Sequence, residues 1–144
     1  MTPEEQEKIA LTIQENAQKF IDDFTLEGNY DLTETSLVHV EWEIEDQYQF
    51  GDPLNTEYNN EFIELVSSYI LEVTRLTLGG KYVWNEKESL PMLVVGEPDF
   101  EMSFLVHNKV RERMESRFLE NIFYHYSIFS DKVKNAKPGD KELI

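Results

Sequence analysis

The stretch that decides the fold is SSYILEVTRLTLGGKYVW, residues 67–84. It begins with a helical pattern, stops at the pair Gly79-Gly80 and continues as an aromatic, extended segment. Apolar residues recur at spacings of three and four from Tyr58 to Leu76, and further apolar residues widen this face. The pattern predicts a long central helix from about residue 55, buried on two sides and closed by a left-handed glycine.

The segments after the glycines predict a small sheet followed by helices. KYVW (81–84) and LPMLVV (90–95) are strand-like, and the polar turn between them indicates a hairpin. FEMSF (100–104) alternates and predicts a third strand, after which helical spacing returns over residues 107–129. The polar end of the chain, about residues 132–144, is interrupted by Pro-Gly, so we expect a mobile tail.

Two further helices are expected before the central one. Thr2-Pro3-Glu4-Glu5 is typical of a helix start, and an apolar stripe continues to Phe24 before Gly28. Residues 36–48 alternate as a strand would, but they also form a helical stripe. Because Glu, Gln and Asp are poor strand formers, we predict a helix there.

This order of segments predicts the α+β class. We expect one domain over residues 1–144, with four to five helices packed around a small antiparallel sheet of two or three strands and a long central helix.

The composition excludes several classes of protein. With 40% hydrophobic residues, the chain of 144 residues can build a core. It contains no Cys, which excludes disulfides, thiolate nucleophiles and Cys-ligated metals and fits a cytoplasmic protein. The start does not resemble a secretory signal, and no apolar run approaches the roughly 18 residues of a membrane span.

The net charge of −16 is placed unevenly. Residues 1–72 hold 18 of the 29 acidic residues but only Lys8 and Lys19 of the 13 basic ones. Such a field repels nucleic acid and anionic membranes and steers a basic partner inward. The alternative is that the charge serves only solubility.

A short pattern resembles a family of small, uncharacterised bacterial proteins. Their central helix is similar to G-x-Y-L-G-E-V-x-R, followed by G-G-x-W, a hairpin, and a helix with K-V-x-x-R. The matching residues here are Tyr69, Ile70, Glu72, Val73, Arg75, Gly79, Gly80, Trp84, Lys109, Val110 and Arg113. The chain departs at both helix glycines, where a serine (Ser67 or Ser68) and Leu71 stand. The resemblance spans about residues 36–130 and implies an α+β bacterial domain, and some members resemble immunity proteins of toxin systems.

The acidic segment EWEIEDQ suggests a surface for a basic protein partner. On a helix, Glu41 and Glu45 lie one turn apart on one face, with Asp46 beside them. Like charges at that spacing repel, and a cationic partner would convert this cost into attraction. A solvated helix face is the alternative.

A basic stripe suggests self-association. Lys109, Arg113 and Arg117 follow one another at intervals of four, so they share a helix face. Arginine suits bidentate contacts with carboxylates, so this stripe can bind the acidic half of the same molecule or of a second copy.

Two further residues are candidates for partner binding. Glu72 and Arg75 can pair on the central helix, either as a binding-site acid or as an ion pair joining helix to sheet. Trp84 can anchor a partner or pack the hairpin on the central helix.

Other chemistries lack a pattern. His39, His107 and His125 have no metal-binding spacing, the glycine pair closes a helix instead of opening one, and the two serines at 67–68 lack a nucleophile motif. We therefore assign no catalytic residue, metal or cofactor. The sequence favours an acidic bacterial binding protein. Its most concrete form would be an immunity-type inhibitor of a basic toxin or of another cationic partner. The alternatives are a small enzyme with Glu72 as its acid and a self-associating accessory protein.

Overall fold

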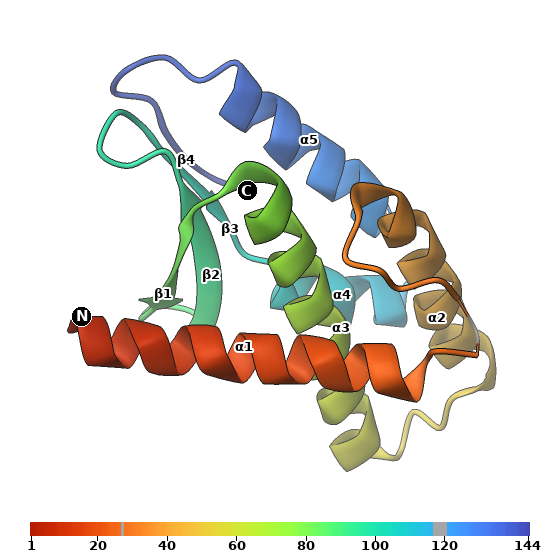
Figure 1. Ribbon diagram of the computed structural model, residues 1–144. Coiled ribbons are helices and arrows are strands. Elements are labelled where there is room, and N and C mark those ends of the chain that lie inside the picture. Colours follow the sequence, from red (N-terminus) through yellow and green to blue (C-terminus); the bar gives the residue numbers. More distant parts are fainter. Residues whose placement is uncertain (27, 117–120) are drawn as a thin grey trace.

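The computed structural model describes residues 1–26, 28–116 and 121–144. Within these residues the chain forms five α-helices, one 3-10 turn and a four-stranded sheet (Figure 1). In chain order the elements are α1 (Pro3–Asp23), η1 (Glu34–Ser36), α2 (Leu37–Phe50), α3 (Thr56–Leu78), β1 (Lys81–Asn85), β2 (Leu90–Val95), β3 (Glu101–Phe104), α4 (His107–Glu115), α5 (Ile122–Lys134) and β4 (Lys141–Leu143). The α+β class agrees with the prediction.

Helix α3 is the predicted central helix. It begins after Asn55, whose side chain accepts a hydrogen bond from the Tyr58 backbone N–H at 3.1 Å, and it ends at Gly79, where φ is +81°. Every residue from Leu65 to Thr74 is buried, because other elements cover α3 on all sides over this length. The sheet lies on one side of α3 and helices α2 and α5 lie on the other, while α1 crosses α3 and reaches β1 (Figure 1).

The ambiguous segment is helical, as predicted. Leu37, Val40 and Ile44 are fully buried at helical spacing, whereas Val38 and Trp42 are exposed. An alternating strand would have placed Val38, Val40 and Trp42 on one side. The helical periodicity therefore decides which residues of α2 face the core and which remain outside.

The sheet is larger than predicted and it is mixed. Strands β1, β2 and β3 pair antiparallel, with Tyr82 opposite Leu93 and Val95 opposite Met102. Strand β4 pairs parallel to β3, in the segment where we expected a mobile tail. Its three residues, Lys141, Glu142 and Leu143, are all exposed, so no hydrophobic pattern marks them as a strand. Backbone hydrogen bonds hold it instead: Ile144 N–H to Ser103 O at 2.8 Å, and Leu105 N–H to Ile144 O at 3.0 Å.

No helix within the described parts of the chain combines the length and the apolar character that crossing a bilayer requires.

Candidate functional site

The outer face of α2 presents an aromatic anchor among acidic residues. The indole of Trp42 is 58% exposed and stacks on the His39 ring, with the ring centres 4.7 Å apart. Asp46 follows Trp42 one turn later, and it makes no ion pair with any residue that the structure describes. We call Val38, Trp42 and Asp46, with Glu41 and Glu45 beside them, the α2 face.

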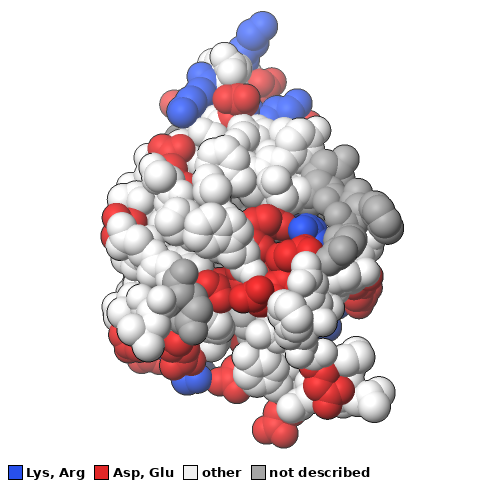
Figure 2. Space-filling view, turned by 90° about the vertical axis from the view of Figure 1, so that its right-hand side faces the viewer, with Lys and Arg blue, Asp and Glu red and all other residues white. Residues whose placement is uncertain are grey.

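This face lies on the side of the molecule seen in Figure 2. Acidic side chains gather there around a hollow near the middle of the view, with one basic side chain next to them (Figure 2). The side of the molecule on which α2 lies therefore carries a concentration of negative charge.

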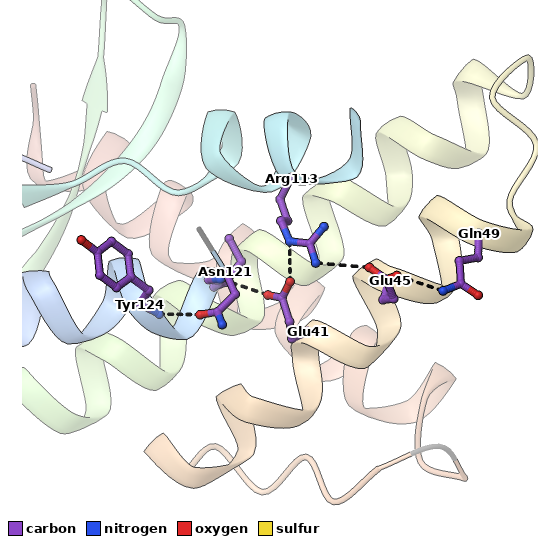
Figure 3. Close-up of polar contacts among 7 residues, drawn as sticks. Glu41, Glu45, Gln49, Arg113, Asn121 and Tyr124 are labelled. Atoms are coloured by element: carbon purple, nitrogen blue, oxygen red, sulfur yellow. Dashed lines mark hydrogen bonds and ion pairs between the residues drawn. The ribbon is translucent and has the colours of Figure 1, made fainter. Parts of the chain in front are cut away.

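Glu41 and Glu45 are held in place by Arg113 of α4 (Figure 3). Arg113 Nε lies 2.6 Å from Glu41 Oε1, an ion pair in which the N–H is not aligned for a hydrogen bond. Arg113 Nη2 donates to Glu45 Oε2 at 3.2 Å, and Gln49 Nε2 donates to Glu45 Oε1 at 2.9 Å. The side chain of Arg113 is only 9% exposed and that of Glu41 18%, whereas Glu45 is 32% exposed, so the contact with Glu41 is the better shielded from water.

Glu41 also joins α2 to the start of α5. Its Oε2 accepts a hydrogen bond from the Ile122 backbone N–H at 3.0 Å, and Asn121 caps the same helix by accepting from Tyr124 N–H at 2.8 Å (Figure 3). A carboxylate at a helix N-terminus is favourable because of the helix dipole. The network of Glu41, Glu45 and Arg113 thus fixes α2, α4 and α5 relative to one another, and we call it the Arg113 clamp.

The basic stripe is divided by this packing. The sequence left open whether this stripe binds acidic residues of the same molecule or of a second copy. Arg113 contacts acidic residues of its own chain. Lys109 is partly covered, and burial lowers the pKa of its ammonium group. Arg117 lies outside the described residues. Self-association through this stripe stays a prediction.

Glu72 lies in the ion pair that joins helix to sheet. Arg75 donates to both carboxylate oxygens of Glu72, at 2.6 and 3.0 Å, and the Tyr82 hydroxyl of β1 donates to Oε2 at 2.7 Å. The hydrogen bonds to Glu72 raise the pKa of Arg75. The pKa of Tyr82 is raised mainly by burial and, to a smaller extent, by its hydrogen bond to the Glu72 carboxylate. Both oxygens of the buried Glu72 therefore already have donors.

Trp84 lies on the hairpin, away from α2. Its side chain is 39% exposed and lines a cavity between α1, α3 and the β1–β2 hairpin. Strand β1 and helix α2 lie on opposite sides of α3 in Figure 1. Among the candidates for partner binding, Glu41, Glu45 and Asp46 thus share one surface, and Glu72 and Trp84 belong to another part of the molecule.

Sequence reasoning did not single out Trp42, nor the contact between Glu64 and His107 at 3.1 Å. Trp42 had a usable signal, because the helical spacing that buries Val40 and Ile44 turns it outward between the acids. The contact of Glu64 with His107 joins residues 43 positions apart, and no local pattern marks it. Within the described ranges no three His, Asp or Glu side chains are grouped so as to hold a metal ion.

Comparisons of this chain with protein-family models, with curated proteins and with solved structures find no match, so its function must be argued from these surfaces alone.

Proposed function

We propose that this chain is a non-enzymatic binding protein that docks a basic protein partner on the α2 face. In its most concrete form it is a bacterial immunity-type inhibitor that covers the cationic surface of a toxin. The observation that carries the proposal is the exposed Trp42, which stacks on His39 and stands among Glu41, Glu45 and Asp46.

An exposed tryptophan of this kind is suited to anchor a partner. Trp, Tyr and Arg dominate the residues that contribute most to protein–protein affinity, and a side chain already fixed by stacking loses little rotamer freedom on binding. The ring face of a Trp also attracts Arg and Lys side chains. Since Asp46 follows at the next turn, a cationic side chain over Trp42 would find a carboxylate within reach.

The net charge of −16 supports a basic partner. A field of this strength raises the rate of encounter with a cationic protein and repels anionic ones. The Arg113 clamp contributes differently, because it keeps the backbone of α2 in place while the partner docks. Rigid presentation reduces the ordering cost of binding.

The alternative of an enzyme with Glu72 as its acid has less support. A catalytic acid or base must reach a substrate proton, and both oxygens of Glu72 accept hydrogen bonds from Arg75 and Tyr82.

The test is capture of a partner from a lysate of the native organism with two matched variants. Trp42→Ala/Asp46→Asn removes an exposed apolar side chain and an acid one turn apart on α2. Leu11→Ala/Glu15→Gln makes the same kind of change on the exposed side of α1, where Leu11 is 54% exposed. We expect a basic protein to be retained at low salt by the wild type and by the α1 variant, and to be lost from the α2 variant.

Kinetics with the purified partner would then test the mechanism. We expect the association rate to fall by roughly tenfold or more between low and physiological salt, as electrostatic steering requires. Equal capture by the wild type and the α2 variant, or an association rate indifferent to salt, would contradict the proposal.

A further inference from the structure

A second surface of the molecule contains a cavity of about 560 Å³. It lies between the N-terminal half of α1, the middle of α3 and the hairpin of β1 and β2. Its volume falls in the range of roughly 300–1,000 Å³ that is typical of small-molecule sites. Its apolar lining includes Ile9 and Ile13 from α1, and Trp84, Leu90 and Pro91 from the hairpin.

A buried hydroxyl without a partner lines this cavity. Ser68 of α3 is 1% exposed, and its Oγ makes no hydrogen bond with any described residue. Leaving a buried hydroxyl unpaired is unfavourable, so most such groups have a partner in the functional state of a protein. Ser68 thus forms part of the cavity wall, with its hydroxyl enclosed behind the surface of that wall.

A carboxylate stands one turn from this hydroxyl. Glu64 and Ser68 are four residues apart on α3, so they lie on the same side of the helix, and both line the cavity. Glu64 Oε2 lies 3.1 Å from Nε2 of the buried His107. For this contact to be a hydrogen bond, His107 Nε2 must carry the proton and Glu64 must accept it. Glu64 Oε1 accepts no hydrogen bond from the residues that the structure describes.

The charge state of Glu64 follows from the same contact. The hydrogen bond from His107 lowers the pKa of Glu64, and it outweighs the partial burial that raises it. Glu64 is therefore a carboxylate at neutral pH. The cavity lining holds two other carboxylates, Glu5 and Glu86, and two ammonium groups, those of Lys8 and of the N-terminus at Met1, so carboxylates exceed cations by one.

We propose that this cavity binds a small organic amine, with its ammonium group at Glu64 and its apolar body against Trp84 and Ile13. A charge-assisted hydrogen bond to Glu64 Oε1 would orient the amine. The ring of Trp84 adds a favourable contact for a cation or an apolar body. An anionic ligand of the same shape would be repelled at Glu64, in a lining whose net charge is negative. This site is independent of the α2 face.

The proposal can be tested with phenylbutylamine, phenylbutanol and phenylbutyrate, which share one apolar body and differ in charge. The chain contains two tryptophans, one in the cavity and one on the α2 face, so their indole N–H signals in NMR spectra report on the two sites separately. We expect phenylbutylamine to shift the Trp84 signal and to leave the Trp42 signal in place. Phenylbutanol should bind about tenfold more weakly, and phenylbutyrate more weakly still.

Glu64→Gln should weaken binding of phenylbutylamine about tenfold and leave binding of phenylbutanol unchanged, because it removes the charge and keeps the shape. Glu57→Gln is the matched control, since Glu57 is an exposed acid on the same helix outside the cavity. Ile9→Trp should fill the cavity and abolish binding of all three probes, which keeps the test decisive if Glu64→Gln fails to fold.

Several results would overturn the proposal. An unmoved Trp84 signal with every probe would mean that the cavity is not a site. Equal binding of phenylbutyrate and phenylbutylamine, or full affinity in Glu64→Gln, would remove the assignment to amines. Binding that survives Ile9→Trp would place the ligand elsewhere. Trp42→Ala/Asp46→Asn should bind phenylbutylamine as the wild type does, so failure of one proposal leaves the other standing.

Discussion

At the scale of single residues, Arg113 links the acidic surface to the packing of the helices. Its guanidinium lies between Glu41 and Glu45, and Glu41 in turn accepts the first backbone N–H of α5. A buried ion pair adds little net stability compared with a well-packed apolar substitute, but removing one partner leaves the other charge without compensation. The clamp is therefore sensitive to the loss of Arg113 alone.

We predict that Arg113→Met lowers the free energy of unfolding by about 3 kcal/mol, because two carboxylates lose the guanidinium that they surround. Arg111→Met is the matched control on the same helix: Arg111 is exposed and donates one hydrogen bond to Asn60 at 3.2 Å. Its loss should cost about 0.5 kcal/mol or less. Urea unfolding of both variants measures the difference. Equal stabilities would show that the clamp does not hold the helices.

The two glycines that end α3 allow a second test at this scale. Both have positive φ, +81° at Gly79 and +104° at Gly80. A Cβ added to Gly79 meets open space, whereas a Cβ on Gly80 would lie 2.6 Å from Val94 O and 2.9 Å from a methyl group of Val95. We predict that Gly79→Ala costs about 1–2 kcal/mol of backbone strain. Gly80→Ala should cost at least about 1 kcal/mol more, since it adds overpacking against β2. Thermal or urea unfolding can compare the stabilities of the two variants. A Gly79→Ala variant less stable than Gly80→Ala would contradict this account of the turn.

At the scale of elements, the sequence predicts those that bury an apolar stripe. Helix α3 and the helix assignment of α2 follow from spacing, because burial selects residues at the helical period. The hairpin follows from two apolar runs around a polar turn. Strand β4 could not be predicted, because backbone hydrogen bonds to β3 hold it and its side chains carry no pattern.

The candidate sites follow the same division. The acidic residues of α2 and the arginine stripe were visible as local patterns. Their contact across 68 residues, from Glu45 to Arg113, depends on how α2 and α4 pack. The cavity beside Ser68 needs three elements from separate parts of the chain, so no window of sequence can reveal it.

Strand β4 should contribute to stability although all three of its residues are exposed. Ile144, which follows it, packs partly against the core and makes two backbone hydrogen bonds with the β3 region. We predict that deleting residues 140–144 costs about 4 kcal/mol, from roughly 1 kcal/mol for each of the three lost backbone hydrogen bonds to the β3 region plus the apolar contact of Ile144. Hydrogen exchange should become faster at the Glu101 and Leu105 amides, which donate to Asp140 and Ile144.

A matched pair separates packing from strand formation in this segment. Ile144→Ala should destabilise the protein more than Leu143→Ala does, because Leu143 is 57% exposed. Unchanged exchange at Leu105 after the deletion would show that β4 does not protect the sheet edge.

At the scale of the whole molecule, the uneven charge of the two halves of the chain is redistributed by the fold. The acidic first half contributes α1 and α2, and these pack on elements from the second half: β1 for α1, and α4 and α5 for α2. Ion pairs such as the Arg113 clamp therefore use acids of one half and a base of the other. Most of the remaining carboxylates are exposed and repel one another.

This repulsion predicts how stability depends on salt. Raising NaCl from about 10 to about 150 mM shortens the screening length from roughly 30 to roughly 8 Å, which weakens repulsion among exposed acids more than contacts inside the clamp. We expect Tm to rise by about 3 °C, equivalent to about 1 kcal/mol for a chain of this size. Glu7→Gln/Glu15→Gln, two exposed acids of α1, should show a smaller rise. If Tm fell with salt instead, attractive ion pairs would dominate the electrostatics of the folded chain. Repulsion among the exposed carboxylates would then be too weak for a basic partner to relieve.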